Sequence, residues 1–192
     1  MPVSYVIDVD TIIILFFIIA GALLLKTVIQ LKKRGRLTKT TFLEFFLKTA
    51  FWGYLTLLTG ITLLPVFIPP QEGSFLSPGI NIIPFYGWTT FTTKLLIINI
   101  SGNLLLFVPW FILGKINNFS LFEKTKRLSI ITLLIILSIE FLQYIEIKFN
   151  FSMENRSFDI TDIILNYGGF FIGIALYKIY EKKLNRSGNS SE

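Results

Sequence analysis

Windows of about 20 apolar residues recur along this chain, and each ends at a charged residue or at Pro and Gly. The hydrocarbon core of a bilayer is about 30 Å thick, so roughly 20 apolar residues of helix are needed to cross it. With 53% hydrophobic and 16% charged residues, the chain lacks the polar surface that a soluble domain needs. We therefore predict an all-α fold, a multi-pass bundle of about five transmembrane helices in the cell membrane, surrounded by the lipid bilayer. The predicted spans are residues 11–29, 43–68, 95–116, 128–149 and 158–180.

The positions of Lys and Arg predict how the chain is oriented in the membrane. Of the 18 Lys and Arg residues, 15 fall within the segments 26–48, 115–127 and 178–192. Short cytoplasmic loops are enriched in these residues. We therefore expect the N-terminus outside, the C-terminus inside, and the loops 69–94 and 149–157 outside.

The chain has no internal repeat and no linker that would join a second domain, so we expect one integral membrane domain over residues 1–192. Residues 181–192 are expected to form a flexible cytoplasmic tail. The net charge is +6, but the basic residues are spread over loops, so no nucleic acid partner is predicted. The absence of Cys and His excludes thiol nucleophiles, thiolate metal sites and an imidazole proton shuttle. No cofactor is predicted.

Polar side chains interrupt three of the predicted spans at a similar depth. At about 1.5 Å of rise per residue, Asn103, Glu140 and Asn166 lie roughly 10 to 12 Å below the outer face. Within each span the polar residues are three or four positions apart, so they share one side of a helix. An ionisable residue that faces lipid costs at least about 2.5 kcal/mol, so these sides should turn inward around a polar pocket open to the exterior. The candidate binding residues are Asn103, Glu140, Gln143, Arg156, Asp159, Asp162 and Asn166.

Simpler interpretations stay open for several of these residues. Asp159 and Asp162 fit the start of a helix, with Asp159 as the N-cap and both carboxylates at the positive end of the helix dipole. Arg156 either neutralises these acids or grips a carboxylate or phosphate from outside. Glu140 lies in the middle of a span, where it is either functional or ion-coordinating, or else a protonated or paired structural group. The sequence leaves open whether a metal binds.

Four short motifs follow one another along the chain: INIIPF (80–85), SGNLLLFVP (101–109), SIEFLQ (138–143) and RSFDITDIILNYGG (156–169). Together they resemble the VanZ-like family of bacterial membrane proteins, over about residues 80–175. The family usually has a Gly two positions after the Pro, where this chain has Phe111, so we expect the kink near Pro109 to differ.

The resemblance implies an integral membrane protein of the cell envelope, whose namesake accompanies glycopeptide resistance genes and lowers susceptibility to teicoplanin. The first hypothesis is that the outward pocket binds the drug or a cell-wall or lipid precursor, with Arg156 contacting an anionic group. The alternative is a membrane-embedded enzyme that modifies a lipid-linked envelope substrate, with or without a divalent cation. Its candidate catalytic residues are Glu140, Asp159 and Asp162. A third hypothesis is a scaffold in which the polar cluster only stabilises the bundle.

Overall fold

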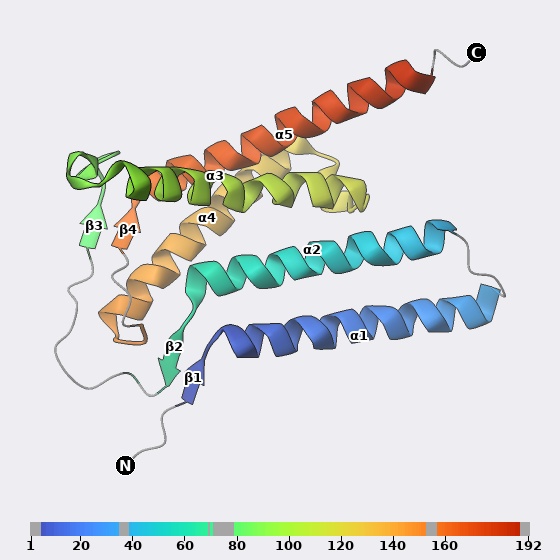
Figure 1. Ribbon diagram of the computed structural model, residues 1–192, viewed down its shortest axis with the longest axis horizontal. Helices are drawn as coiled ribbons and strands as arrows, with labels where there is room; N and C mark the ends of the chain where they lie inside the picture. The colour runs from blue at the N-terminus through green and yellow to red at the C-terminus, as the bar shows by residue number, and fades with distance from the viewer. Residues whose placement is uncertain (1–4, 35–38, 69, 71–78, 153–156, 189–192) are drawn as a thin grey trace. The chain divides into compact units, whose positions relative to one another are not determined.

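The computed structural model describes residues 5–34, 39–68, 70, 79–152 and 157–188, and these residues are mostly helical (Figure 1). The predicted all-α class with about five helices is confirmed within this part of the chain. The five α-helices are α1 (Val9–Arg34), α2 (Lys39–Leu63), α3 (Thr93–Ile116), α4 (Thr125–Lys148) and α5 (Ile160–Gly188).

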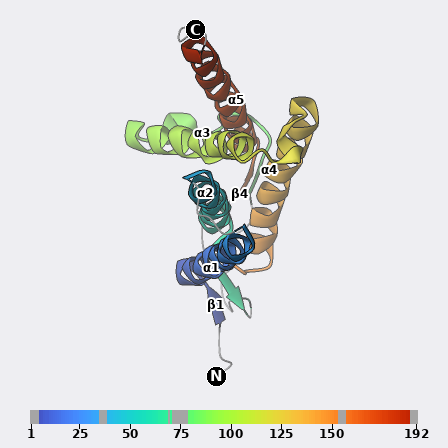
Figure 2. The ribbon, with the colours of Figure 1, turned by 90° about the vertical axis from the view of Figure 1, so that its right-hand side faces the viewer.

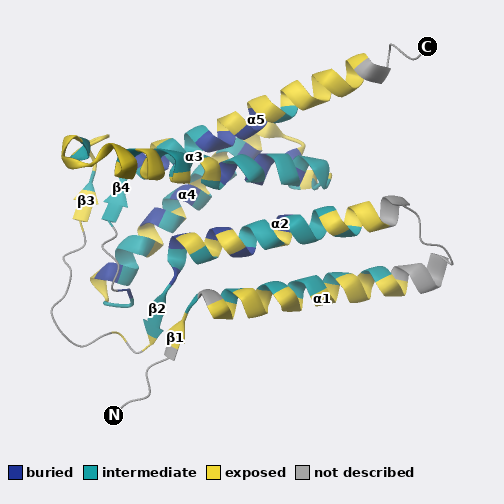
Figure 3. Ribbon diagram, viewed as in Figure 1, coloured by how far each residue is buried: buried dark blue, intermediate teal, exposed yellow. Residues whose placement is uncertain are grey.

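Four of these helices, α1, α3, α4 and α5, are long and apolar enough to cross a membrane. The mean hydropathy of their most apolar windows ranges from 1.4 for α5 to 2.8 for α1. Over Asp10–Ile29, α1 is largely exposed (Figure 3), and most of its exposed residues are large and apolar, as expected for a helix that faces lipid. The predicted orientation, with the N-terminus outside, stays a prediction.

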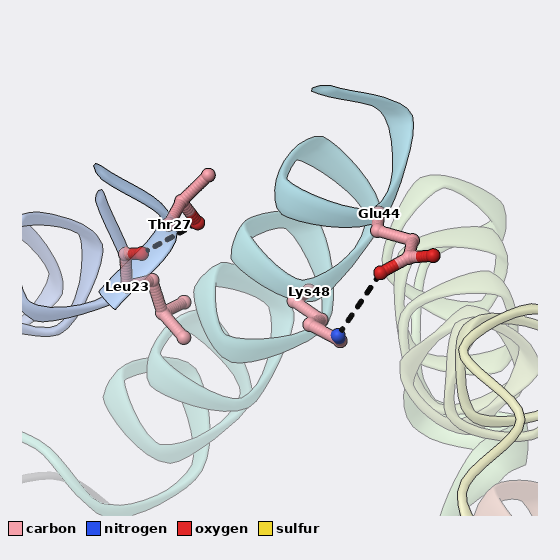
Figure 4. Close-up of polar contacts among 4 residues, drawn as sticks. All are labelled: Leu23, Thr27, Glu44 and Lys48. Carbon is pink, nitrogen blue, oxygen red and sulfur yellow. Dashed lines mark hydrogen bonds and ion pairs between the residues drawn. The ribbon is translucent and has the colours of Figure 1, made fainter. Parts of the chain in front are cut away.

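The helix α2 is the exception among the five. It carries Lys48, Tyr54 and several Thr residues among its apolar ones, and it is not among the four helices that are long and apolar enough to cross a membrane. Lys48 pairs with Glu44 one turn earlier, with 3.7 Å between Nζ and Oε2, and both side chains are largely exposed (Figure 4). An exposed pair of this kind stabilises a helix by only about 0.3 to 0.5 kcal/mol. On α1, the Thr27 hydroxyl donates a hydrogen bond to the Leu23 carbonyl of its own helix, at 2.8 Å (Figure 4).

The C-terminal end of α2 differs from the predicted span. The helix ends at Leu63 instead of near Ile68, because Pro65 has no amide hydrogen with which to continue the helix. The Leu64–Pro65 peptide bond is cis. Beyond it the chain is extended, and Val66–Ile68 forms the strand β2.

In the part of the chain that the structure describes, four strands of three residues each accompany the helices, and none of them was predicted from the sequence. They form two sheets of two strands. The antiparallel sheet pairs β1 (Tyr5–Ile7) with β2 (Val66–Ile68), and the parallel sheet pairs β3 (Gly79–Asn81) with β4 (Ser157–Asp159). Each sheet therefore joins segments that are far apart in the sequence.

The chain forms two compact units. The first holds residues 1–82 and 137–159, and the second holds residues 83–136 and 160–192. The helix α4 begins in the second unit and ends in the first.

In the first unit, α1 and α2 lie side by side (Figures 1 and 2). Small residues on α2 receive large side chains of α1: a Cβ added to Gly53 would lie 2.8 Å from the ring of Phe16, and one added to Gly60 would lie 3.4 Å from Ile12. Close approach through small residues is the usual way for helices to pack in lipid. The pairing of β1 with β2 ties the start of α1 to the end of α2.

In the second unit, α3 packs along α5, and both helices carry buried residues (Figure 3). Phe107 and Phe111 of α3 and Phe170 of α5 are each at most 2% exposed. The rings of Phe111 and Phe170 contact edge to face at 5.8 Å, a favoured aromatic geometry. The second half of α5 is exposed and remains helical as far as Gly188, so much of the tail expected to be flexible from residue 181 is helical.

Candidate functional site

A hydrogen-bonded series of three polar side chains lies at the end of β4 in the first unit. The parallel pairing of β3 with β4 places Asn81 opposite Asp159, and Asn81 Nδ2 donates to Asp159 Oδ2 at 2.9 Å. The backbone N–H of Asp159 donates to Oε2 of Glu140 at 3.2 Å. Glu140 is only 2% exposed. A strand pair and a membrane helix thus bring two predicted site residues, Glu140 and Asp159, into direct contact.

The positions of Asp159 and Asp162 agree with the helix-start interpretation. Asp159 directly precedes Ile160, the first residue of α5, so it occupies the position of an N-cap. Asp162 is the third residue of α5, in the first turn, where the helix dipole favours a negative charge. The contacts of Asp159 with Asn81 and Glu140 are additional to this local role.

Gln143, one turn after Glu140 on α4, supports the end of another helix. Its Nε2 donates to the backbone carbonyl of Thr62 at 2.8 Å. Thr62 lies in the last turn of α2, where carbonyl groups have no partner within the helix. Gln143 therefore has a structural contact in this unit that the sequence did not predict.

In the second unit, the predicted residues Asn103 and Asp162 contact each other across the α3–α5 interface. Asn103 Nδ2 donates to Asp162 Oδ1 at 2.5 Å. Below this pair, α5 presents Gly169 and Gly173 to the backbone of α3, and a Cβ added to Gly173 would lie 2.6 Å from the Val108 carbonyl oxygen. The glycines bring the two helices close enough for the polar pair to meet.

Asn166 lies on the same side of α5, between Asp162 and Gly169. It is 5% exposed, and its Oδ1 is buried without a hydrogen-bond partner among the described residues. A buried amide oxygen that lacks a partner costs about 1 to 3 kcal/mol. Such a cost is common where a side chain serves a ligand.

Arg156, the remaining predicted site residue, lies outside the described residues. Within the described part of the chain, no group of three or more Asp and Glu residues is placed to hold a metal ion. The prediction that the seven residues line one outward pocket stays a prediction.

A comparison with known protein families decides what kind of membrane protein this is. Residues 51–181, about two thirds of the chain, match the model of the VanZ/LLP1 family. The chain belongs to the VanZ/LLP1 family. Neither the curated proteins nor the solved structures contain a match to it.

Family membership and the four apolar helices together make this chain a multi-pass membrane protein. The matched region of the VanZ/LLP1 family begins earlier than the predicted core of residues 80–175 and includes much of α2. In the first unit, hydrogen bonds connect α2 and the strand after it to residues of the predicted core. The end of α2 bonds to Gln143 on α4, and the N–H of Phe67 on β2 donates to the Phe151 carbonyl at 2.7 Å.

Two polar residues that contact the family motifs, one in each unit, were not among the predicted site residues. Asn81 belongs to the INIIPF motif, but its partner Asp159 is 78 residues away, and no periodicity connects them. Thr161 is 1% exposed, and its hydroxyl accepts the N–H of Phe85 at 2.9 Å. Phe85 has a φ of 61°, so this bond holds a strained turn in the outer-loop motif. Only the family motif pointed to these positions.

The departure from the family pattern at Phe111 leaves α3 uninterrupted. The helix continues through Pro109 to Ile116. Phe111 is 2% exposed, and its ring lies 5.8 Å from the rings of both Phe170 and Tyr177 on α5. The large side chain therefore fills the α3–α5 interface where the family usually has a Gly.

Proposed function

We propose that this VanZ/LLP1 protein lowers susceptibility to glycopeptide antibiotics such as teicoplanin, through an outward-facing polar pocket that binds the drug or a cell-wall or lipid precursor. Family membership and the membrane location support the envelope role. The observation that carries the proposal of a working site is the near-complete burial of Glu140 against Asp159.

The chemistry of this contact favours a ligand that carries hydrogen-bond donors. Glu140 and Asp159 both carry carboxyl oxygens that accept hydrogen bonds, and the Asp159 backbone lies against the Glu140 carboxyl group. The backbone N–H of Asp159 donates to Glu140, and the amide of Asn81 donates to Asp159. An ammonium, amide N–H or hydroxyl group of a bound molecule would be a further donor to these oxygens. Glycopeptides and the sugar and peptide parts of cell-wall precursors carry all three kinds of donor.

In this proposal, Arg156 supplies the positive charge that binds an anionic group of the ligand. This residue stands three positions before Asp159 in the sequence, and a guanidinium is suited to a carboxylate or phosphate because it donates two parallel hydrogen bonds. Donor groups of the ligand would then contact the carboxylates, while its anionic group would contact Arg156.

The test is deletion of the gene and re-expression of variants, with the minimum inhibitory concentration of teicoplanin and the amount of protein in the membrane both measured. We expect Glu140→Gln, Asp159→Asn and Arg156→Ala to reach wild-type membrane levels and to lose most of the protection. Glu181→Gln, the same kind of change at an exposed position on α5, is the matched control and should protect fully. An unchanged teicoplanin susceptibility after deletion would contradict the proposal.

One observation supports the enzyme hypothesis. Glu140 and Asp159, two candidate acid–base residues, are in contact through the Asp159 backbone N–H. Asp162, its third candidate, instead receives the Asn103 amide in the second unit. The two functions differ in a direct assay. Purified wild-type protein that converts a lipid-linked precursor, with Glu140→Gln inert but still able to bind the drug, would favour the enzyme.

A further inference from the structure

A small pocket lies in the second unit, where α3 ends and α4 begins, and none of the residues of the proposed site lines it. Its volume is about 300 Å³. The lining residues are Ser120, Leu121, Glu123, Lys124 and Arg127.

The position of the pocket between two apolar helices determines which layer of the membrane it faces. The helices α3 and α4 are both long and apolar enough to cross the membrane, and only eight residues, 117–124, separate them. A connection this short between two spanning helices lies at the membrane surface, at the level of lipid headgroups, whichever way the protein is oriented. The pocket therefore opens where phosphate groups are concentrated.

The charges in the pocket favour an anion. Lys124 and Arg127 line it, and neither forms an ion pair within the described residues, although Glu123 is a neighbour of both. The lining thus carries two positive charges and one negative charge. Lys126, in the first turn of α4 between Lys124 and Arg127, adds a further positive charge to this segment. The hydroxyl of Ser120 supplies a neutral donor at the same place.

The wall of the pocket is held firmly in position. The 3-10 helix η2 (Ser120–Phe122) is anchored by Phe122, which is 2% exposed and packs its ring 4.9 Å from that of Trp110. Gly114 makes room for this ring, since an added Cβ would overlap it. At the other side, Leu128 is fully buried and donates its N–H to the Lys124 carbonyl at 3.0 Å. A preorganised wall reduces the cost of ordering side chains around a ligand.

From the pocket, its charges and its place at the headgroup level, we infer that Lys124 and Arg127 bind the phosphodiester of an anionic phospholipid such as phosphatidylglycerol. The guanidinium of Arg127 can donate two hydrogen bonds to phosphate oxygens, while Lys124 adds a point charge. This lipid site is independent of the proposed antibiotic function and uses none of its residues.

The test uses the purified full-length protein in detergent, with phosphatidylglycerol, phosphatidylcholine or inorganic phosphate added at equal concentrations. Bound lipid is counted by native mass spectrometry and the melting temperature is followed. We expect phosphatidylglycerol to bind and stabilise, and the other two to do so much less. In Lys124→Gln/Arg127→Gln the affinity should fall roughly 30-fold, because each basic residue near anionic lipid contributes about fivefold. Equal effects of inorganic phosphate would show an ion site and overturn the lipid assignment.

Two further variants separate a specific site from general attraction and from misfolding. Lys182→Gln/Lys183→Gln removes the same charge from exposed positions on α5 and should leave the affinity unchanged. Glu123→Gln removes the negative charge from the pocket and should strengthen lipid binding by about fivefold, a gain that misfolding cannot produce. An equal loss in both double variants, or no gain in Glu123→Gln, would overturn the inference.

Discussion

Asp159 donates its backbone N–H to the carboxylate of Glu140, although 19 residues separate them in the sequence. Asp159 ends a short strand and Glu140 lies within a membrane helix, so the contact ties an extended segment to a helix in the first unit. The strand is fixed in turn by pairing with β3, which places Asn81 against the Asp159 side chain. The position of a buried carboxylate thus depends on a sheet of two strands.

The Asn81–Asp159 contact predicts a measurable coupling. A hydrogen bond to a charged group contributes about 1.5 to 3 kcal/mol when buried, and these side chains are half-buried, so we expect about 1 kcal/mol. Asn81→Ala, Asp159→Ala and the double variant should give this coupling as the excess of the summed single losses over the double loss, measured by thermal unfolding in detergent. Additive losses would mean that the contact contributes nothing to stability.

The α3–α5 interface predicts opposite effects for two glycines. Gly169→Ala places a Cβ against the Leu104 carbonyl, which is backbone and cannot move aside easily, so we expect a loss of about 2 kcal/mol or more. Gly102→Ala is the matched control on α3, because nothing lies within 4 Å of the added Cβ. That change should be neutral or should stabilise by up to about 1 kcal/mol. Melting temperatures in the same detergent compare the two, and equal values would contradict the close packing.

A buried hydrogen bond between α3 and α4 gives the third prediction. Trp110 Nε1 donates to Thr132 Oγ1 at 3.0 Å, and Thr132 is fully buried. Thr132→Val keeps the shape but removes the hydroxyl that accepts this bond, so a loss of about 1 to 3 kcal/mol is expected. In the control Thr59→Val, the hydroxyl lost is exposed and bonds only to its own helix at Leu55, so little should change. Similar losses for both variants in thermal unfolding would show that the contact between helices adds no stability.

The helices could be predicted because their signal is local. The length of each apolar run, with the charges that end it, placed every bound of α1, α3, α4 and α5 within about three residues, except the C-terminal ends of α1 and α5, which were predicted five and eight residues too early. The end of α2 was predicted five residues too late, because the apolar run continues from Pro65 to Ile68 before the next prolines, whereas the helix already stops before Pro65. The contact of Asn103 with Asp162 joins two residues that were both predicted as polar positions at the inner faces of their helices.

The strands and their contacts could not be predicted, since their cause is not local. Each strand has three residues, too few for an alternating pattern to stand out. The partner of Asn81 is 78 residues away, and Gln143 bonds to a backbone carbonyl 81 residues away, so only the folded chain reveals these pairs. Helix periodicity gives the side on which a residue lies, but not what it meets there.

A variant of Asn166 can distinguish a polar residue that binds a ligand from one that only stabilises the fold. Its Oδ1 is buried and has no partner among the described residues, so the side chain costs stability in the protein by itself. Asn166→Leu keeps the branching and the number of side-chain heavy atoms and removes this cost, and we expect the melting temperature to stay equal or to rise. If Asn166 serves a ligand, the same variant should lose teicoplanin protection at wild-type membrane levels. A variant that unfolds or fails to accumulate would instead mean that Asn166 stabilises the α3–α5 interface.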